Sequence, residues 1–457
     1  MVSTPAVVIA APASGSGKTT VATGLMGALR RAGHRVAPFK VGPDFIDPGY
    51  HRLAAGRPSR NLDPVLLGEH LIGPLYRHGS DDADIAVVEG VMGLFDGRIS
   101  EVASTGAARG STAHVAGLLG APVVLVVDAR GQSHSIAALL HGFATFDRAV
   151  RIAGVILNRV GSARHDAVLR QACEQAGVPV LGAIPRTDEL SVPSRHLGLV
   201  TAIEHGARAE SAIEAMTALV TRHVDLPAVL AAAASRVSDQ CWTPAARAPV
   251  TGPVRIALAA GRAFSFGYAE HVEMLRGAGA EVEEFDPLRE PLPADTDALV
   301  LPGGFPEEFG AELSANETVR RQIAALAARG GPIHAECAGL TYLVDDLDGA
   351  PMCGVIGGSA RFTDRLTLGY RDAVAVADSP LHAIGQRVVG HEFHRTTVEF
   401  TAPVQPAWRL RGPGGRVLDD GVVQDRVHAA YLHTHPAAAP DSVAGFVAAA
   451  ATSKLAG

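Results

Sequence analysis

Two short segments of this 457-residue chain contain residue types that could do chemistry. Residues 12–19 read PASGSGKT, in which glycines, a lysine and a hydroxyl could surround a phosphate. Residues 334–339 read HAECAG and place Cys337 where a strand is expected to turn into a helix. A cysteine in that position can act as a nucleophile, and the distant His433 could serve as its base. The chain therefore combines a candidate nucleotide site with a candidate thioester site.

The first segment has the context that a phosphate-binding loop requires. It follows an apolar strand predicted at Val7–Ala11 and opens a helix predicted at Lys18–Ala32. Pro12 stands where the usual pattern begins with glycine, and the alternative is a glycine–serine turn with an incidental lysine. The strand–loop–helix order favours a phosphate loop for ATP, in which the lysine reaches the terminal phosphates and the next hydroxyl holds Mg²⁺. The predicted nucleotide-binding residues are Gly15, Ser16, Gly17, Lys18, Thr19 and Thr20.

Four carboxylates follow predicted strands in the same half of the chain. Glu89 ends the apolar run IAVVE, at the edge of an open α/β sheet where ligands gather. Asp44 and Asp47 lie in KVGPDFIDPG, and Asp96 lies in GVMGLFDG. Each of them alone could instead cap its own loop. Because a hard cation takes oxygen ligands, we predict Thr19, Asp44 and Glu89 as Mg²⁺ ligands, with Asp47 and Asp96 as further metal or substrate candidates.

The cysteine segment PIHAECAGLTYL predicts a strand, a tight turn at Cys337 and a helix. In this nucleophile-elbow arrangement the helix N-terminus favours the thiolate. The N–H groups of Ala338 and of Gly304, in LVLPGGFPEEF, are the expected oxyanion donors. The alternative is an ordinary buried cysteine. The elbow and the glycine pair together favour the nucleophile.

The base that serves this cysteine should be a histidine distant in sequence. VHAAYLHTHP contains His428, His433 and His435, and VGHEFHRT contains His391 and His394. The first three could also form a metal cluster, but no cysteine or carboxylate is arranged around them. Strand alternation places His433 and His435 on the same face, so periodicity does not choose between them.

Alternating strand and helix patterns predict an α/β fold, with a parallel sheet covered on both faces in the N-terminal half. Periodicity is lost around residues 225–253, which are rich in Ala and Pro, and a second α/β series begins at Val254–Ala259. We predict a synthetase-type domain at 1–235, a linker at 236–253 and a second domain at 254–445, followed by a helical tail. The other predicted strands are Val36–Lys40, Ile85–Glu89, Val123–Asp128, Ile152–Asn158, Val180–Ile184, Ala298–Leu301 and Pro332–Ala335, and the other predicted helices are Ser133–Phe146 and Arg164–Ala176.

The composition excludes several classes of partner. Charged residues make up 19% of the chain and its net charge is −7, which argues against nucleic acid as the main partner. Met1 is followed by no signal peptide pattern, and no apolar run nears the ~20 residues that span a bilayer, so no membrane association is expected. The four cysteines are widely spaced, which predicts free thiols in a reducing cytoplasm.

Several motifs, in their order and spacing, resemble the cobyrinic acid a,c-diamide synthases from residue 6 to residue 440. The resemblance implies an N-terminal P-loop domain like dethiobiotin synthetase and a C-terminal class I glutamine amidotransferase domain of the cobyric-acid-synthase type. It also implies that Cys337 is the nucleophile, that His433, first in YLHTH, activates it, and that Asn158 reads the nucleotide base. The motifs are PASGSGKTT, KVGPDFIDPGYH, VVEGVMGLFDG, LNRVGS, LPGGFPE, AECAGLTYL, HEFHRT and AYLHTH.

The implied reaction uses ATP, Mg²⁺ and glutamine to amidate the a and c acetates of a corrinoid polycarboxylic acid, either hydrogenobyrinic or cobyrinic acid. One alternative is an amidotransferase for another corrinoid or a cell-wall carboxylate. Another is a partitioning-type regulatory ATPase, but such proteins carry a signature lysine where this chain has Ala13. A homodimer is compatible with the sequence but not specified by it.

The chain departs from the family pattern at three positions. AFSFGYAEH has Gly267 and His271 where the family usually has a tyrosine and an asparagine. His435 stands two residues past His433, where many class I amidotransferases carry a glutamate. The sequence therefore assigns no third member to the Cys337–His433 pair.

Overall fold

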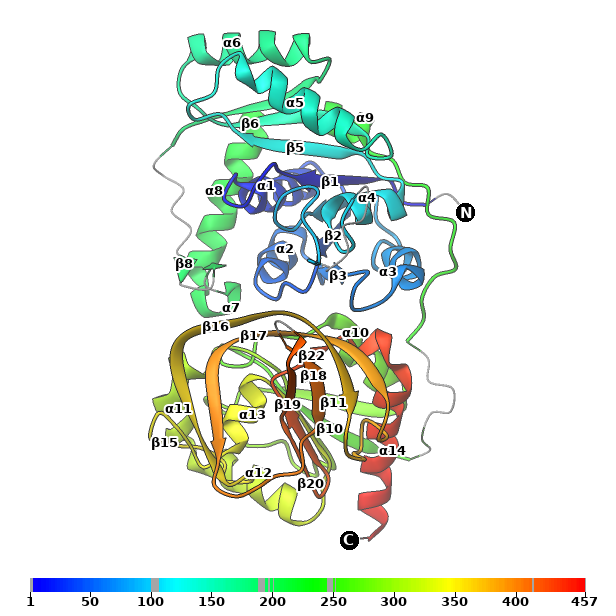
Figure 1. The fold of residues 1–457 in the computed structure, drawn as a ribbon, viewed down its shortest axis with the longest axis vertical. Helices are drawn as coiled ribbons and strands as arrows, with labels where there is room; N and C mark the ends of the chain where they lie inside the picture. The colour runs from blue at the N-terminus through cyan, green and yellow to red at the C-terminus, as the bar shows by residue number, and fades with distance from the viewer. Residues whose placement is uncertain are drawn as a thin grey trace. The chain divides into compact units, whose positions relative to one another are not determined.

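The computed structural model describes residues 3–99, 107–187, 194–195, 198–199, 201–244, 250, 252–412 and 415–456. The internal contacts divide the chain into two compact units, Met1–Thr243 and Pro244–Gly457, and each unit is an α/β structure (Figure 1). The division falls inside the predicted linker at 236–253. None of the helices in the described ranges is long and apolar enough to cross a membrane.

The first unit is organised around seven parallel strands in the order β3-β2-β4-β1-β5-β6-β7 (Figure 1). All residues of β1, β2 and β4 are buried, as expected for strands covered on both faces. The six strands predicted here are confirmed to within two residues at each end. The strands are β1 Ala6–Ala10, β2 Val36–Val41, β3 Arg60–Leu62, β4 Ile85–Glu89, β5 Val123–Asp128, β6 Ile152–Val160 and β7 Val180–Pro185.

Helices join these strands and pack in pairs, α1 on α2 and α8, α3 on α4, and α5 on α6. Local capping defines several helix starts: the Ser111 and Ser162 hydroxyls each accept a hydrogen bond from the N–H three residues later. The helices predicted in this unit are confirmed. The helices are α1 Lys18–Arg31, α2 Asp47–Ala55, α3 Ile72–Gly79, α4 Thr112–Leu119, α5 Ser135–Phe146, α6 Ala163–Gln175, α7 Ala202–His205, α8 Ala207–His223 and α9 Leu226–Ala232.

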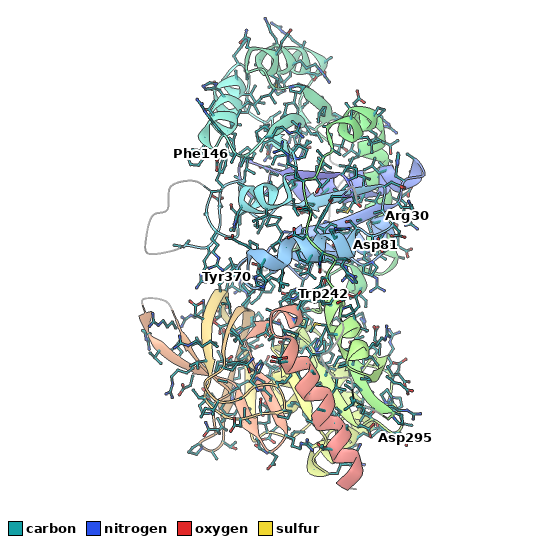
Figure 2. All side chains as sticks on the ribbon, turned by 90° about the vertical axis from the view of Figure 1, so that its right-hand side faces the viewer. Arg30, Asp81, Phe146, Trp242, Asp295 and Tyr370 are labelled. Atoms are coloured by element: carbon teal, nitrogen blue, oxygen red, sulfur yellow. The ribbon has the colours of Figure 1, made fainter. Side chains whose placement is uncertain are left out.

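The segment after residue 225, where the sequence loses its periodicity, begins with a helix that lies inside the predicted first domain. Leu226–Ala232 form α9, and the Asp225 carboxylate caps its first turn. The chain then stays on the first unit: the Arg236 N–H donates to the Leu119 carbonyl at 2.9 Å. The Trp242 side chain, labelled in Figure 2, belongs to this segment. Its ring packs edge-on against His78, with ring centroids 4.9 Å apart. An alanine-rich helix of 7 residues is too short to show the 3.6-residue hydrophobic periodicity by which a helix is predicted from sequence.

The second unit contains a six-stranded sheet in the order β11-β10-β12-β13-β21-β20, parallel except for β20. Its helices include α13, which follows Cys337 directly, and α14, which confirms the predicted helical tail. The strands are β10 Val254–Ala259, β11 Ala280–Phe285, β12 Ala298–Leu301, β13 Ile333–Glu336, β20 Val422–Gln424 and β21 Val427–Ala430, and the helices are α10 Ala269–Gly277, α11 Gly310–Ala315, α12 Glu317–Ala328, α13 Ala338–Leu343 and α14 Pro440–Ala456.

A second, mostly antiparallel sheet in this unit was not predicted. Its main pair is β16 and β17 (Figure 1). Strand β17 also pairs with β22, which brings His391 opposite His433. The register between β16 and β17 shifts between Phe362 and Thr367, which marks a bulge. The strands are β14 Asp346–Leu347, β15 Ala350–Pro351, β16 Gly358–Ala375, β17 Arg387–Phe400, β18 Trp408–Arg411, β19 Val417–Asp420 and β22 His433–Thr434.

Candidate functional site

The phosphate-loop candidate lies between β1 and α1. Gly17 has a φ of 98°, a left-handed conformation that residues with a side chain rarely adopt. A Cβ atom at Gly17 would also collide with the Asn158 amide, which comes from β6 and donates to the Ser16 carbonyl at 2.9 Å. The loop is therefore held in shape from across the sheet, and Thr20 lies in the first turn of α1. Asn158, which the resemblance implies reads the nucleotide base, thus lies against the loop.

Lys18 and Thr19 face different partners at the carboxyl ends of the strands. The Lys18 ammonium is mostly buried and donates to the Met92 carbonyl at 2.5 Å. Burial lowers the pKa of Lys18, and the nearby Glu89 opposes that shift. The Thr19 hydroxyl donates to Glu89 Oε1 at 2.6 Å and lies 3.4 Å from Asp47 Oδ2. Thr19, Asp47 and Glu89 thus bring three oxygen-bearing side chains together.

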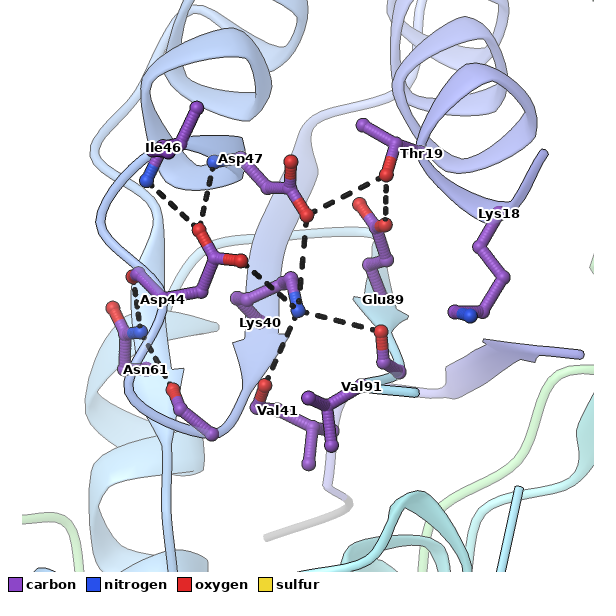
Figure 3. Close-up of polar contacts among 12 residues, drawn as sticks. Lys18, Thr19, Lys40, Val41, Asp44, Ile46, Asp47, Asn61, Glu89 and Val91 are labelled. Carbon is purple, nitrogen blue, oxygen red and sulfur yellow. Dashed lines mark hydrogen bonds and ion pairs between the residues drawn. The ribbon is translucent and has the colours of Figure 1, made fainter. Parts of the chain in front are cut away.

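Lys40, on β2, neutralises this acidic cluster and was not among the predicted site residues. Its ammonium lies 3.7 Å from Asp44 Oδ2 and 3.8 Å from Asp47 Oδ2, and donates to the Val41 and Gly90 carbonyls (Figure 3). Burial alone would lower the pKa of Lys40, but Asp44, Asp47 and Glu89 raise it. A lysine inside an otherwise apolar strand was the sequence signal for such a role.

His51, in α2, is a second partner that sequence reasoning missed. Its Nε2 lies 2.6 Å from Glu89 Oε2, and both side chains are almost fully buried. Burial opposes ionisation of Glu89, but His51, Lys40 and Thr19 outweigh it and lower the Glu89 pKa. Since Glu89 Oε1 faces Thr19, the two carboxylate oxygens point to opposite partners. The contact with His51 thus holds the carboxylate so that Oε1 of Glu89 faces Thr19.

The four predicted carboxylates occupy different positions. Asp44 Oδ1 accepts from the Ile46 and Asp47 amides at 2.8 and 2.9 Å, so Asp44 shapes its own loop as well as facing Lys40 (Figure 3). Asp96 accepts from the Gly93 amide at 3.0 Å, as in the loop-capping alternative. Asp47 is the carboxylate that joins Glu89 near Thr19, and burial, Asp44 and Glu89 raise its pKa well above the usual range.

The donor set fits a hard divalent cation, with a change in one ligand from the predicted set. Thr19, Glu89 and Asp47 supply a hydroxyl and two carboxylates, and phosphate oxygens and water would complete the octahedron that Mg²⁺ prefers. Within the described ranges no group of three or more His, Cys, Asp or Glu side chains is arranged to hold a metal ion. The protein's own share of a metal site here is thus small, as in nucleotide-dependent phosphoryl-transfer sites.

The cysteine candidate lies at the sharp turn that the sequence predicts. Cys337 follows β13 and precedes α13, with φ 50° and ψ −98°, a strained conformation for a residue with a side chain. Its sulfur, only 3% exposed, lies 3.8 Å from the Phe393 carbonyl. Burial and the charge of Glu307 raise the pKa of this thiol above its usual value. The Ala338 and Gly304 amides donate toward the sulfur and lower the pKa, but by less. The resting sulfur is therefore a protonated thiol, with the two predicted oxyanion donors beside it.

His433 and His435 lie in different surroundings, which separates the two candidates that periodicity left open. His433, fully buried on β22, has Nδ1 3.5 Å from Glu336 Oε2 and packs against Gly303, where a Cβ would collide with its ring. Gly303 precedes the oxyanion donor Gly304. His435 instead lies under the Tyr268 ring, with centroids 4.2 Å apart, and its ring accepts from the Ala437 amide. His433 is thus the histidine beside the elbow.

The remaining histidines form a buried group on the inner side of this site. His271 and His334 have ring centroids 5.7 Å apart, and His334 and His428 are 6.3 Å apart. Burial and neighbouring histidines lower the pKa of His271 to about 4 and that of His428 well below its usual value. The His271 and His428 rings are therefore neutral packing groups. His271, where the family pattern has asparagine, belongs to this group.

Together, the phosphate loop on a parallel sheet and the cysteine elbow beside an oxyanion pair define an ATP-dependent synthetase joined to a glutamine amidotransferase. Residues 7–200 match the CobQ/CobB/MinD/ParA nucleotide binding domain family, and residues 255–440 match the CobB/CobQ-like glutamine amidotransferase domain family. A partitioning-type ATPase would not explain the second match, which covers an amidotransferase domain at residues 255–440.

Relatives with known names extend this match over the full length. The hydrogenobyrinate a,c-diamide synthase of Mycobacterium tuberculosis is 71% identical over 448 residues, covering 98% of both chains. That of Streptomyces coelicolor is 53% identical over 98% of both chains. The cobyrinate a,c-diamide synthase of Synechococcus sp. is 40% identical over 97% of this chain and 98% of the relative. The chain belongs to the a,c-diamide synthase family of glutamine-dependent amidating ligases.

Proposed function

We propose that this protein is a hydrogenobyrinate a,c-diamide synthase, which amidates the a and c acetate carboxylates of a metal-free corrinoid in cobalamin biosynthesis. The preference for hydrogenobyrinate over cobyrinate rests on the relatives: those named for hydrogenobyrinate are 50–71% identical, whereas those named for cobyrinate are 40–41% identical. ATP and glutamine are supplied in the cytoplasm, where we place the reaction. The observation that carries the proposal is one chain with both a phosphate loop and a cysteine elbow.

The glutaminase half-reaction begins at Cys337. As its sulfur attacks the glutamine carboxamide carbon, His433 takes the thiol proton, and the Ala338 and Gly304 amides stabilise the oxyanion. Collapse of the tetrahedral intermediate breaks the C–N bond, and His433 returns the proton to the departing ammonia. Water then hydrolyses the γ-glutamyl thioester to glutamate and restores the thiol.

The synthetase half-reaction begins with ATP on the loop from Gly15 to Thr19, where the backbone amides and Lys18 hold the phosphates. The substrate carboxylate attacks the γ-phosphorus, giving an acyl phosphate and ADP, because a free carboxylate is a poor electrophile. Ammonia then attacks the acyl carbon and phosphate leaves, which forms the amide. Two such cycles amidate both acetates.

In the synthetase site Thr19, Glu89 and Asp47 would hold Mg²⁺, with Asp44 and Asp96 shaping the loops around them. When bound, the cation would neutralise phosphate charge during transfer. His51 keeps Glu89 directed at Thr19, and Lys40 offsets the charge of the aspartates before nucleotide binds. Asn158 lies beside the loop, and we assign it to the nucleotide base.

The test offers hydrogenobyrinic acid and cobyrinic acid separately to the purified protein with ATP, Mg²⁺ and glutamine, and mass spectrometry counts the amides formed. We expect a gain of two amides on hydrogenobyrinic acid. Two amides on cobyrinic acid alone would move the substrate assignment to the cobalt-containing corrinoid. ATP hydrolysis with no amide on either acid would mean that the synthetase half acts on another carboxylate.

A further inference from the structure

Glu336, the residue immediately before Cys337, faces the proposed catalytic histidine. Its Oε2 lies 3.5 Å from His433 Nδ1, and its side chain is only 15% exposed. We propose that Glu336 is the positioning residue that completes the Cys337–His433 pair, in place of the glutamate that many class I amidotransferases carry two residues past the histidine. The inference rests on the proposed glutaminase roles of Cys337 and His433.

The fold places this carboxylate beside the histidine by way of strand ends. Glu336 is the last residue of β13, and the elbow at Cys337 turns the chain away immediately afterwards. The backbone N–H and the hydroxyl of Thr434 both donate to Glu336 Oε1 at 3.1 Å. This anchors one oxygen to β22 and leaves the other, Oε2, directed at His433, the residue before Thr434. The two active residues and their proposed orienting group therefore come from two adjoining strand ends.

Glu336 must be ionised to orient His433 and to stabilise its imidazolium. Burial opposes ionisation, but the neighbouring His334 and His433 rings, each with a nitrogen 3.5 Å from a carboxylate oxygen, hold the pKa of Glu336 well below its usual range. The carboxylate is ionised at neutral pH. His334 also approaches Glu336 Oε1, with Nε2 at 3.5 Å.

Other titratable groups surround His433 without replacing this carboxylate. His391 on β17 is opposite His433, and burial, His433 and Arg371 lower the pKa of His391 to about 3, so that ring is neutral. Arg371 of β16 is paired with Glu392 at 2.5 Å. On the side of α10, Glu270 faces His435 at 3.9 Å, and His271 packs on His334. The Cys337 thiol completes the surroundings.

The contact has a defined chemical consequence. A carboxylate on Nδ1 favours the tautomer with hydrogen on Nδ1, which leaves Nε2 free of hydrogen to take the Cys337 proton. When His433 becomes an imidazolium, the adjacent negative charge stabilises it. Without that charge the imidazolium formed during proton transfer loses its stabilising partner. Glu336 thus acts through His433 and need not touch glutamine.

The experiment measures glutamate release from glutamine by the full-length protein across acid and alkaline pH. Glu336→Gln keeps the side-chain shape and an acceptor for Thr434 but removes the charge. We expect kcat to fall about 10- to 100-fold with little change in KM. The acid limb of the pH profile should move to lower pH, because the negative charge 3.5 Å from Nδ1, which stabilises the imidazolium, is gone. Ammonia-dependent amidation should continue at the wild-type rate, which shows that the fold and the synthetase half are intact.

Thr434→Val is the matched control for the charge: it removes the hydroxyl contact, while the Thr434 backbone N–H still holds Glu336 Oε1 and the charge beside His433 remains. We expect its pH profile to match that of the wild type. Wild-type kcat and an unshifted profile in Glu336→Gln would overturn the inference, as would equal losses in both variants. If Glu336→Gln also loses ammonia-dependent amidation, Glu336→Asp decides: a restored profile supports the inference and an unrestored one overturns it. Absence of glutaminase activity in the wild type would instead refute the proposed function.

Discussion

At the scale of single residues, both sites hold buried charged or ionisable groups beside a matching partner. Lys40 faces Asp44 and Asp47, and Glu89 is held between His51 and Thr19. A buried charge is costly unless it is paired, so these contacts decide which groups remain ionised. The sequence predicted the loop residues and the cysteine, whose context is local. It could not predict Lys40 or His51, because each works through a residue from another strand or helix.

We expect Lys40→Met to destabilise the protein. The substitution leaves the partly buried carboxylates of Asp44 and Asp47, 31% and 14% exposed, without their cation, which we expect to cost about 3 kcal/mol. The free energy of unfolding is measured by urea denaturation in the presence of a chelator, so that no divalent cation substitutes for the ammonium. Lys40 is 2% exposed, which makes solvent a poor replacement.

Arg31→Met is the control for this measurement. Arg31 pairs with Glu214 at 2.5 Å, but the two side chains are 49% and 66% exposed. An exposed pair contributes less than about 1 kcal/mol, so this variant should remain close to the wild type. Equal destabilisation by the two substitutions would contradict the role given to Lys40.

At the scale of elements, the apolar strands were predictable because their continuous burial leaves a plain signal. The strands β16 and β17 were not predictable from the sequence, because they mix buried and exposed residues and include charged side chains. A bulge also interrupts their pairing. The sheet they form positions His433 through the pairing of His391 with it. The sequence pattern therefore could not predict the strand β22 that positions His433. His433 itself could be named only from the resemblance to the family.

Gly17→Ala tests the loop as an element. The substitution places a Cβ at a φ of 98° and against the Asn158 amide, so both the loop and its neighbour must move. We expect ATP affinity to fall at least about tenfold, which corresponds to about 1.4 kcal/mol. Isothermal titration with a non-hydrolysable ATP analogue measures the change.

Gly15→Ala is the comparison for that test. Gly15 also has a positive φ, 78°, but a Cβ there would meet no atom within 4 Å. This variant carries the backbone strain without the collision and should lose less affinity. An equal loss would mean that backbone strain alone, and not the Asn158 contact, governs the loop.

At the scale of the whole molecule, two compact units hold the two proposed half-reactions. Lys18 lies in the first unit and Cys337 in the second, so single substitutions can separate the chemistry. Both units were predictable as α/β domains, because each is built from strands with their own apolar runs. The segment from residue 226 to residue 243 was harder to predict, because α9 is short and Trp242 contacts the first unit through tertiary packing.

We expect Cys337→Ala to abolish glutamine-dependent amidation and to leave amidation with free ammonia intact. Lys18→Ala should lose amidation with either nitrogen source, because neither can react with an unphosphorylated carboxylate. Amide formation is followed by mass spectrometry with each nitrogen source. Glutamine-dependent turnover that survives in Cys337→Ala would show that another residue is the nucleophile.

The burial of Cys337 also affects which thiol of the purified protein is oxidised first during storage. Peroxide and dissolved oxygen modify thiolates that they can reach, and Cys337 is 3% exposed with a pKa raised by burial. Cys241 is the exposed free cysteine of the four. We therefore expect oxidative damage during storage to begin at Cys241, as disulfide-linked pairs of molecules, before it reaches Cys337. A serine at that position would lengthen the shelf life of a preparation without touching either proposed site.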